Sequence, residues 1–190
     1  WDGSTARRFL PQMIDAGVTL IEQPVAKWNV EALKTLSATL GDRASIMADE
    51  TVCSPQDAMM LARAQASQVF SLKVAKHGGL LRTKAIAAVA EAADIAWYGG
   101  TMLETSIGSA ASAQVFSTLG NKHHGCELFG PQLLVDDIVT ELMPIVDFEL
   151  QLPDGPGIGV EIDPVKLERF DRARAGLTAT HIDLGYKQVA

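Results

Sequence analysis

The stretch that decides the fold runs from residue 44 to residue 72 and reads ASIMADETVCSPQDAMMLARAQASQVFSL. Its apolar start predicts a strand over 44–48, and its last four residues predict another over 69–72. Between them, Ser54 is placed to cap a helix, with Pro55 in the first turn and Asp57 near the positive end of the helix dipole. A strand, a helix and a second strand joined by short loops are typical of a parallel sheet.

The same alternation continues on both sides of this unit. We predict a helix capped by Ser4 or Thr5, kinked at Pro11 and ended at Gly17, and then a strand over 18–21. Further helices are predicted over 30–40, 79–93 and 103–119, and further strands over 95–98 and 126–128. This α/β pattern indicates a parallel sheet, as either a barrel or a doubly wound layer. No Gly-rich nucleotide-binding loop follows any predicted strand, which disfavours the doubly wound alternative.

Composition limits the function classes. The 190 residues are 47% hydrophobic and 21% charged, which is typical of a globular protein. With 16 Lys and Arg against 23 Asp and Glu, the net charge is −7, so we expect no nucleic-acid partner. The most apolar stretch, Ala85 to Tyr98, is interrupted by Glu91 and Asp94, so we expect no membrane span. Two cysteines are too few for a disulfide scaffold and favour a cytoplasmic location.

Charged residues follow four of the predicted strands. Glu22 follows the first strand, Asp49 and Glu50 the second, Lys73 the third and Glu127 the last. The carboxyl ends of parallel strands meet at one edge, where barrel enzymes carry their active sites. Two carboxylates on neighbouring strands suit a hard divalent cation such as Mg²⁺ or Mn²⁺. A lysine beside them could bind a substrate carboxylate or move a proton.

Each of these residues also has a purely structural interpretation. Glu22 could be a turn carboxylate, Asp49 or Glu50 a helix-start carboxylate, Lys73 a salt-bridge partner of Glu22 or Asp49, and Glu127 half of a buried ion pair. The remaining conspicuous residues are interpreted as structural. They are His77, as the mark of a helix start, and the packing residues Trp28, Met59, Met60 and Trp97.

Five sequence blocks together resemble the muconate-lactonizing subgroup of the enolase superfamily. They read IEQP at 21–24, MADE at 47–50, LKVAKHGG at 72–79, YGGTMLETSIG at 98–108 and ELFGP at 127–131. The last two blocks, with DGPGIG at 154–159, are most similar to muconate and chloromuconate cycloisomerases. The resemblance covers about residues 1 to 170.

The resemblance implies a (β/α)7β barrel with an α+β capping domain. On this basis the chain is expected to be a partial TIM-like barrel holding strands 4–8, with the capping domain largely missing. Residues 1–130 would be the C-terminal part of the barrel, 131–170 a segment returning toward the capping domain, and 171–190 a polar tail. The implied activity is the reversible lactonization of cis,cis-muconate or chloromuconate in the catabolism of aromatic compounds, with Mn²⁺ or Mg²⁺ as cofactor.

The resemblance also implies roles for individual residues. Glu22 and Asp49 would be metal ligands, and Glu50 would support these ligands without contacting the metal itself. Lys73 would lie on the far face of the substrate, and Glu127 would be the proton donor. The family's third metal ligand, an Asp, and its Lys-x-Lys acid/base pair would fall just upstream of this chain. We therefore expect a C-terminal fragment that is inactive alone, from an enzyme that acts on a small dicarboxylate and forms a homo-oligomer.

Two alternatives remain at this point. One keeps the fold and the metal but changes the substrate, as in a dipeptide epimerase or an o-succinylbenzoate synthase. The other is a truncated barrel without activity, because half of a barrel exposes open sheet edges.

Overall fold

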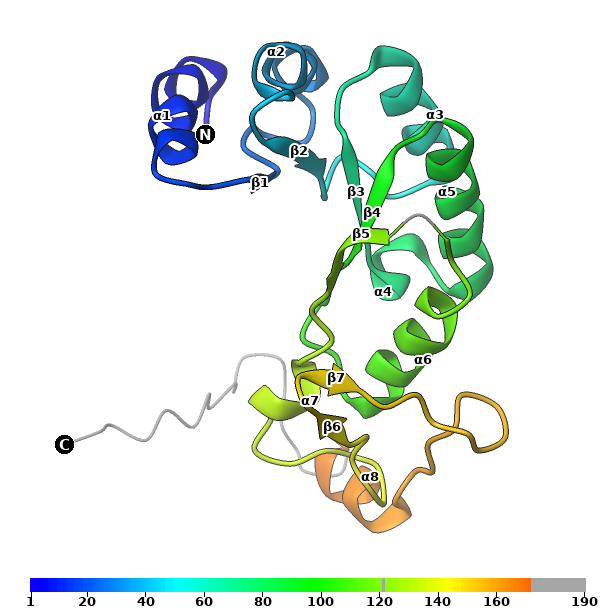
Figure 1. The fold of residues 1–190 in the computed structure, drawn as a ribbon. Helices are drawn as coiled ribbons and strands as arrows, with labels where there is room; N and C mark the ends of the chain where they lie inside the picture. The colour runs from blue at the N-terminus through cyan, green and yellow to red at the C-terminus, as the bar shows by residue number, and fades with distance from the viewer. Residues whose placement is uncertain (121, 172–190) are drawn as a thin grey trace, which may run out of the picture.

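A computed structural model describes residues 1–120 and 122–171, and its centre is a curled sheet of five parallel strands (Figure 1). Each strand pairs with the next one along the chain, in the order β1–β2–β3–β4–β5. The strands are Leu20–Glu22, Ser45–Ala48, Val69–Leu72, Ala96–Gly99 and Lys122–Cys126. Because every strand points the same way, all five carboxyl ends lie at one edge of the sheet.

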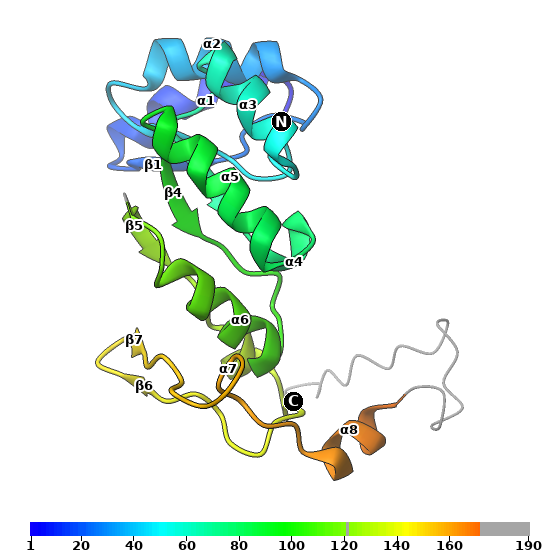
Figure 2. The same ribbon diagram turned by 90° about the vertical axis from the view of Figure 1, so that its right-hand side faces the viewer.

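The longer helices lie on the outer, convex side of this sheet (Figures 1 and 2). They are α1 (Gly3–Asp15), α2 (Val30–Leu40), α3 (Pro55–Ala64), α5 (Leu80–Ala92) and α6 (Ser106–Phe116), while α4 (Val74–His77) is a single turn after β3. A doubly wound sheet has helices on both faces, so that alternative is wrong. The expected partial barrel is confirmed, and within the described residues β1 and β5 are each paired on one side only.

The hydrophobic core lies between the sheet and these helices. Side chains on the outward face of the strands, such as Ile46, Phe70 and Trp97, are buried against the helices. Trp97 also lies 5.3 Å from the ring of Phe116 on α6. Packing was therefore the right interpretation of Trp97.

The same interpretation was wrong for Trp28, which is 81% exposed, and for Met59 and Met60, which are about half exposed. Trp28 belongs to the loop after β1 rather than to a core-facing strand or helix. Met59 and Met60 lie on the outward side of α3, away from the sheet.

Local capping explains where several helices begin. Ser54 accepts a hydrogen bond from the backbone N–H of Asp57, and the Asp57 carboxylate accepts one from the N–H of Ser54, as the sequence predicts for α3. The cap of α1 differs from the prediction, because Asp2 rather than Ser4 or Thr5 accepts the free N–H groups of the first turn.

Pro11 does not interrupt α1, which runs unbroken to Asp15. The fixed φ of proline is compatible with a helix, so the ring removes one hydrogen bond without ending the element here.

Two strands are displaced from their predicted positions. β1 begins at Leu20, because the backbone N–H of Val18 still donates to the carbonyl of Met13 at the end of α1. β5 covers Lys122–Cys126 instead of 126–128, since it pairs with β4 through Trp97 and Gly99. The shift in β1 makes Glu22 the last residue of the strand rather than the first residue after it.

Beyond the sheet, the chain forms short elements, as its turn-rich sequence predicts. These are α7 (Gly130–Leu133), an antiparallel pair of β6 (Ile145–Val146) and β7 (Glu149–Leu150), and α8 (Pro164–Phe170). An isolated bridge between Val139 and Ile162 joins the segment before the pair to the one before α8. The polar tail predicted over 171–190 lies outside the described residues, except for residue 171.

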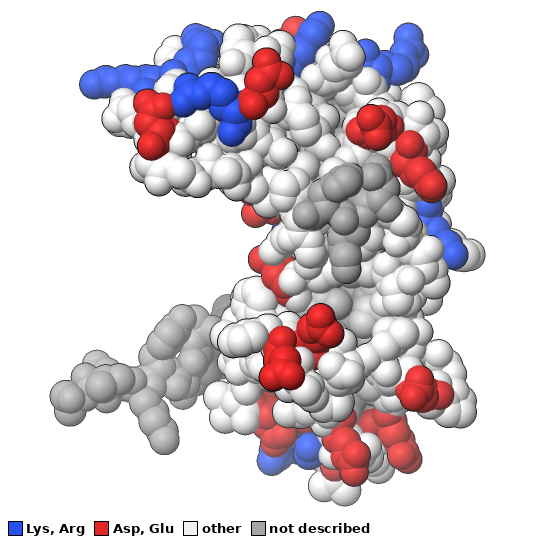
Figure 3. Space-filling model, in the orientation of Figure 1, with Lys and Arg blue, Asp and Glu red and all other residues white. Residues whose placement is uncertain are grey.

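The described part of the molecule is an open arc (Figure 3). The recess of the arc is on the side opposite to the helices. None of the described helices is long and apolar enough to cross a membrane.

Candidate active site at the strand ends

Three of the predicted site residues meet at the ends of β1, β2 and β3. The Nζ atom of Lys73 lies 2.5 Å from Oδ2 of Asp49 and 3.9 Å from Oε1 of Glu22. The three side chains line a hollow of about 560 Å³, together with Trp1 and Trp28. The predicted convergence of Glu22, Asp49 and Lys73 on one edge of the sheet is therefore present in the structure.

A fourth charged residue, Lys76, completes this cluster and was not predicted to belong to it. Its ammonium group lies 2.5 Å from Oδ1 of Asp49, 2.8 Å from the Asp49 carbonyl and 2.9 Å from the Ser71 carbonyl. Both carboxylate oxygens of Asp49 are thus paired with lysines. The signal in the sequence was the spacing of three residues from Lys73, which one turn of helix α4 brings to the same side.

The electrostatics of the cluster favour a charged Asp49. Burial by itself would raise the pKa of Asp49, but the charges and hydrogen bonds of Lys76 and Lys73 outweigh burial and lower it. The pKa of Lys73 is raised despite its burial, because Asp49 and Glu22 stabilise its ammonium form. The pKa of Lys76 is lowered by burial, which the charge of Asp49 only partly offsets.

The pKa of Glu22 is shifted in the opposite direction to the pKa of Asp49. Burial raises the pKa of Glu22, and the nearby charge of Asp49 raises it further, against the attraction of Lys73. Two carboxylates held close together repel each other, and a cation between them relieves the repulsion. In this structure the Lys73 ammonium group takes that position.

A glycine makes room for the Lys73 side chain. A Cβ atom added to Gly100 would lie 2.6 Å from Cε of Lys73 and 2.7 Å from the Ser71 hydroxyl. Neither distance is compatible with normal packing. Gly100, which follows β4, therefore allows the lysine stem to cross the end of the next strand.

Glu127 lies on the far side of the recess, directly after β5. Its backbone N–H donates to the Gly99 carbonyl over 2.8 Å, and its Oε2 accepts a hydrogen bond from the Tyr98 hydroxyl over 3.2 Å. Burial raises the pKa of Tyr98 to about 12, and the charge of Glu127 adds to this effect. Within the described residues Glu127 makes no ion pair, so the structural alternative of a buried pair does not apply.

Glu127 and the cluster of Glu22, Asp49 and Lys73 line different hollows. Glu127 belongs to a hollow between β5, α6 and the β6–β7 pair, and the Glu22 cluster to the one near Trp28. The charge of Glu127 nevertheless contributes to the raised pKa of Glu22. The structure therefore places three of the four predicted residues in one hollow, and Glu127 acts on Glu22 from a second hollow through its charge.

Comparison with known proteins shows to which family this chain belongs. The family model for enolase C-terminal domain-like proteins matches residues 1–166. The chain belongs to the enolase C-terminal domain-like family.

Named relatives in this family have similar sequences over most of the chain. A chloromuconate cycloisomerase of Pseudomonas putida is 49% identical over 173 residues, which are 91% of this chain and 46% of that protein. Muconate cycloisomerase 1-2 of Acinetobacter lwoffii is 46% identical over 181 residues, or 95% of this chain and 46% of its own length. The chain thus spans about half the length of the curated relatives it matches.

Solved structures give the same result for the fold. A 2-chloromuconate cycloisomerase from Rhodococcus opacus 1CP superposes with a TM-score of 0.86 at 45% identity, over 90% of this chain and 46% of that one. A muconate lactonizing enzyme from Pseudomonas putida has the same TM-score, identity and coverage. The partial barrel is therefore a part of the enolase C-terminal domain-like fold.

The donor atoms in this family member suit a hard divalent cation. Glu22 and Asp49 offer carboxylate oxygens, the ligands that Mg²⁺ and Mn²⁺ prefer, and the Lys73 ammonium group occupies the position of a cation between them. Among the described residues, no group of three or more His, Cys, Asp and Glu side chains converges on one point. The chain thus presents two carboxylates that fit part of such a site.

Glu50 borders the site without supporting its carboxylates directly. Its side chain is exposed and lines the same hollow, and its charge helps to raise the pKa of Lys73. In the described part of the chain no hydrogen bond joins the Glu50 carboxylate to Glu22 or Asp49.

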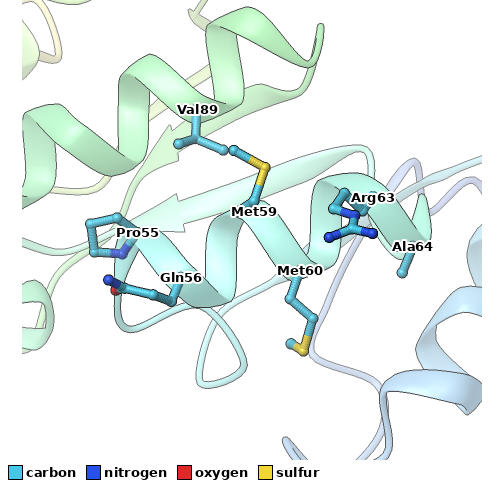
Figure 4. A pocket seen from close by; sticks show the side chains of 7 residues that line it. All are labelled: Pro55, Gln56, Met59, Met60, Arg63, Ala64 and Val89. Carbon is cyan, nitrogen blue, oxygen red and sulfur yellow. The ribbon is translucent and has the colours of Figure 1, made fainter.

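A further hollow on the outer surface has a different character (Figure 4). It is lined mainly by apolar side chains of α3 and α5, including Met59, Met60 and Val89. Arg63 is the one charged residue in its lining. It lies on the helical side of the sheet, away from the strand ends, and brings no acid–base pair together.

Proposed function

We propose that this chain forms part of the active site of a metal-dependent cycloisomerase that interconverts cis,cis-muconate or chloromuconate and its lactone. The observation that carries the proposal is the meeting of Glu22, Asp49 and Lys73 at three consecutive strand ends. It occurs in a chain about 45% identical to proteins named as muconate and chloromuconate cycloisomerases. We infer a role in the catabolism of aromatic compounds, in the cytoplasm.

Glu22 and Asp49 would hold the metal ion, Mn²⁺ or Mg²⁺, through their carboxylate oxygens. When bound, the ion supplies positive charge that stabilises an oxygen anion on the substrate. Lys76 donates to the carbonyls of Asp49 and Ser71 and to Oδ1 of Asp49, so it would orient the Asp49 side chain. Preplaced charges of this kind are usually the largest contribution to catalysis, because they need no reorganisation during the reaction.

Lys73 and Glu127 would act on the substrate itself. In lactonization, one carboxylate of the dicarboxylate attacks a carbon of the conjugated double bonds, and negative charge develops toward the other carboxylate. The Lys73 ammonium group, whose pKa is raised, is a permanent positive charge facing that region. Glu127, oriented by Tyr98, would deliver the proton that completes the addition.

Three further features belong to this proposal. The substrate is a small dicarboxylate, and neither nucleic acid nor membrane is a partner. The full-length protein forms a homo-oligomer. The chain of 190 residues is inactive alone, because Glu22 and Asp49 provide two metal-binding carboxylates and no third such ligand joins them among the described residues.

The test measures consumption of cis,cis-muconate with Mn²⁺, followed by the ultraviolet absorbance that disappears with the conjugated diene. This chain is compared with a version extended upstream, and we expect turnover by the extended version only. If neither version consumes muconate or chloromuconate, the substrate assignment is wrong, and dipeptide epimerization and o-succinylbenzoate synthesis are assayed next. Turnover by the short chain alone would show that the residue roles are wrong.

A further inference from the structure

We propose that Gln23 is a positioning residue that sets the spacing between Glu22 and Asp49, and thereby the affinity of the site for a divalent cation. The inference rests on the proposed function, since it assumes that these two carboxylates bind the ion. Gln23 carries no charge, and both polar groups of its amide bind other parts of the protein, so its effect on the metal site is transmitted through these hydrogen bonds.

The side chain of Gln23 joins the end of β1 to the loop after β2. Its Oε1 accepts three hydrogen bonds, from the backbone N–H of Asp49 over 2.9 Å, from the N–H of Thr51 over 3.2 Å and from the Thr51 hydroxyl over 3.0 Å. Its Nε2 donates to the Val25 carbonyl over 2.9 Å. Both ends of the amide are therefore used, which fixes its orientation.

The position of this link matters because the strand pairing stops here. The pairing of β1 with β2 ends at Glu22 and Met47, and the N–H of Gln23 donates to the Met47 carbonyl over 2.8 Å. Asp49 lies beyond that point. The hydrogen bond from its own N–H to Gln23 is what ties its backbone to the residue next to Glu22.

The backbone of Gln23 supports the same interpretation. Its φ is +34°, in the left-handed region that side chains other than glycine seldom adopt. Such a conformation is unfavourable for a residue with a side chain and persists where the surrounding contacts hold it in place. A glycine would remove the strain but also the amide that receives three hydrogen bonds. The hydrogen bonds of the Gln23 side chain thus explain why a residue other than glycine stands at this strained position.

The neutral charge of Gln23 suits this role. A lysine or arginine that bridged the same groups would repel a bound cation and compete for the two carboxylates. An amide satisfies the N–H groups of Asp49 and Thr51 without either effect. Residues that orient metal ligands in this way typically change metal affinity by about 10- to 100-fold when they are replaced.

The experiment measures Mn²⁺ binding by titration calorimetry and by electron paramagnetic resonance, in the protein as its gene encodes it. Gln23→Met keeps the length of the side chain but removes the hydrogen bonds, and we expect its dissociation constant to rise by about 10-fold or more. Gln23→Glu keeps an acceptor oxygen for Asp49 and Thr51 but loses the donor to the Val25 carbonyl, so we expect it to weaken Mn²⁺ binding less than Gln23→Met does.

Gln68, which directly precedes β3, provides a matched control, because its amide also binds the backbone of β2. Its Oε1 accepts from the Ile46 N–H over 3.0 Å and its Nε2 donates to the Ser37 hydroxyl over 2.6 Å, near the opposite end of β2. We expect Gln68→Met to lower thermal stability while its Mn²⁺ dissociation constant stays at the wild-type value. Amide hydrogen exchange without metal is a second readout, and it should accelerate at Asp49 and Thr51 in Gln23→Met only.

The outcomes separate this inference from the proposed function. Wild-type protein that binds no Mn²⁺ would overturn both. Mn²⁺ binding that is equal in the wild type and Gln23→Met would overturn the inference alone, as would an equal loss in Gln68→Met or a loss in Gln23→Glu as large as in Gln23→Met. Weak binding confined to Gln23→Met, with faster exchange at Asp49, supports it.

Discussion

At the scale of single residues, the two carboxylates of the candidate metal site differ in what they contribute to folding. Asp49 pairs with two largely buried lysines, and its pKa is lowered. Glu22 is half exposed, and its pKa is raised by burial and by the charge of Asp49. A carboxylate with a lowered pKa is stabilising when charged, whereas one with a raised pKa is destabilising when charged.

This difference predicts opposite effects for two isosteric variants. Asp49→Asn leaves the ammonium groups of Lys73 and Lys76 close together without their counterion, and we expect a loss of about 3 to 5 kcal/mol in unfolding free energy. Glu22→Gln removes an unfavourable charge, so we expect no loss of stability at pH 7. Urea denaturation gives both values. An equal loss in the two variants would contradict the assigned electrostatics.

The same pair of variants tests the proposed chemistry in the full-length protein. We expect both Glu22→Gln and Asp49→Asn to abolish metal-dependent turnover, because each removes one charged ligand of the ion. The measurement is the loss of muconate absorbance at saturating Mn²⁺. Normal activity of either variant would remove that residue from the metal site.

His77 gives a prediction for pH. It ends α4 rather than starting a helix, contrary to the sequence interpretation, and its side chain is 1% exposed. Neither ring nitrogen makes a hydrogen bond of normal geometry to a described residue. Burial lowers the pKa of His77 to about 4, and the charge of Lys76 acts in the same direction. The folded state therefore keeps this imidazole neutral where the unfolded state protonates it.

The direction in which pH changes the stability follows from the number of protons that His77 binds in the folded and in the unfolded state. Between the unfolded pKa near 6.5 and the folded value of about 4, only the unfolded chain binds the proton, so stability falls as the pH falls through this range. The contribution of His77 to this loss is about 3 kcal/mol, from the pKa difference at about 1.4 kcal/mol per unit. Denaturation curves at pH 7 and pH 4 should show a smaller loss in His77→Leu. An unchanged loss would mean that other groups cause the acid sensitivity.

At the scale of elements, the sequence predicts helix starts well where a side chain caps its own first turn. The reciprocal bonds of Ser54 and Asp57 need only residues three apart, so they are readable from the sequence. Strand limits were less predictable. The start of β1 depends on Val18 remaining bonded to the end of α1, and β5 depends on its register with β4.

The caps of α3 and α6 form a matched pair for measurement. The Ser54 side chain caps α3, whereas Thr105 precedes α6 without a side-chain cap hydrogen bond. We expect Ser54→Ala to lower the unfolding free energy by about 1 kcal/mol, and Thr105→Ala to change it by a few tenths at most. Thermal denaturation followed by circular dichroism measures both. Equal losses would show that the capping box contributes nothing specific.

At the scale of the whole molecule, the open arc leaves backbone and apolar groups unpaired. β1 and β5 each have one free edge within the described residues, and the exposed side chains of Trp1, Phe9 and Met13 line a hollow at α1. Free strand edges pair readily with other chains, and exposed apolar surface adds to the attraction.

We therefore expect the isolated 190-residue chain to self-associate as its concentration rises, measured by sedimentation velocity. Phe9→Lys places a charge in the apolar hollow that Trp1, Phe9 and Met13 line, and should reduce the association. Met60→Lys adds the same charge to the outer hollow shown in Figure 4, away from both edges, and should reduce it less. A chain that stays monomeric at all concentrations would contradict this expectation.

The sequence by itself determined the alternation of strands and helices, the cap of α3 and the place of Glu22, Asp49 and Lys73 at strand ends. These features follow from local signals, namely hydrophobic periodicity, capping residues and the direction of parallel strands. Because the strands are parallel and pair in chain order, the three side chains lie at one edge of the sheet, and this placement can be predicted from the sequence.

The tertiary structure alone decided which groups bind one another at that edge. Lys73 and Lys76 reach Asp49 from 24 and 27 residues away, Gln23 reaches Asp49 across 26 residues, and Tyr98 reaches Glu127 across 29. Such contacts depend on the curl of the sheet and on the room left by Gly100, neither of which has a local pattern in the chain. The pKa values and the proposed metal site follow from these long-range contacts, because charge and burial act through space rather than along the sequence.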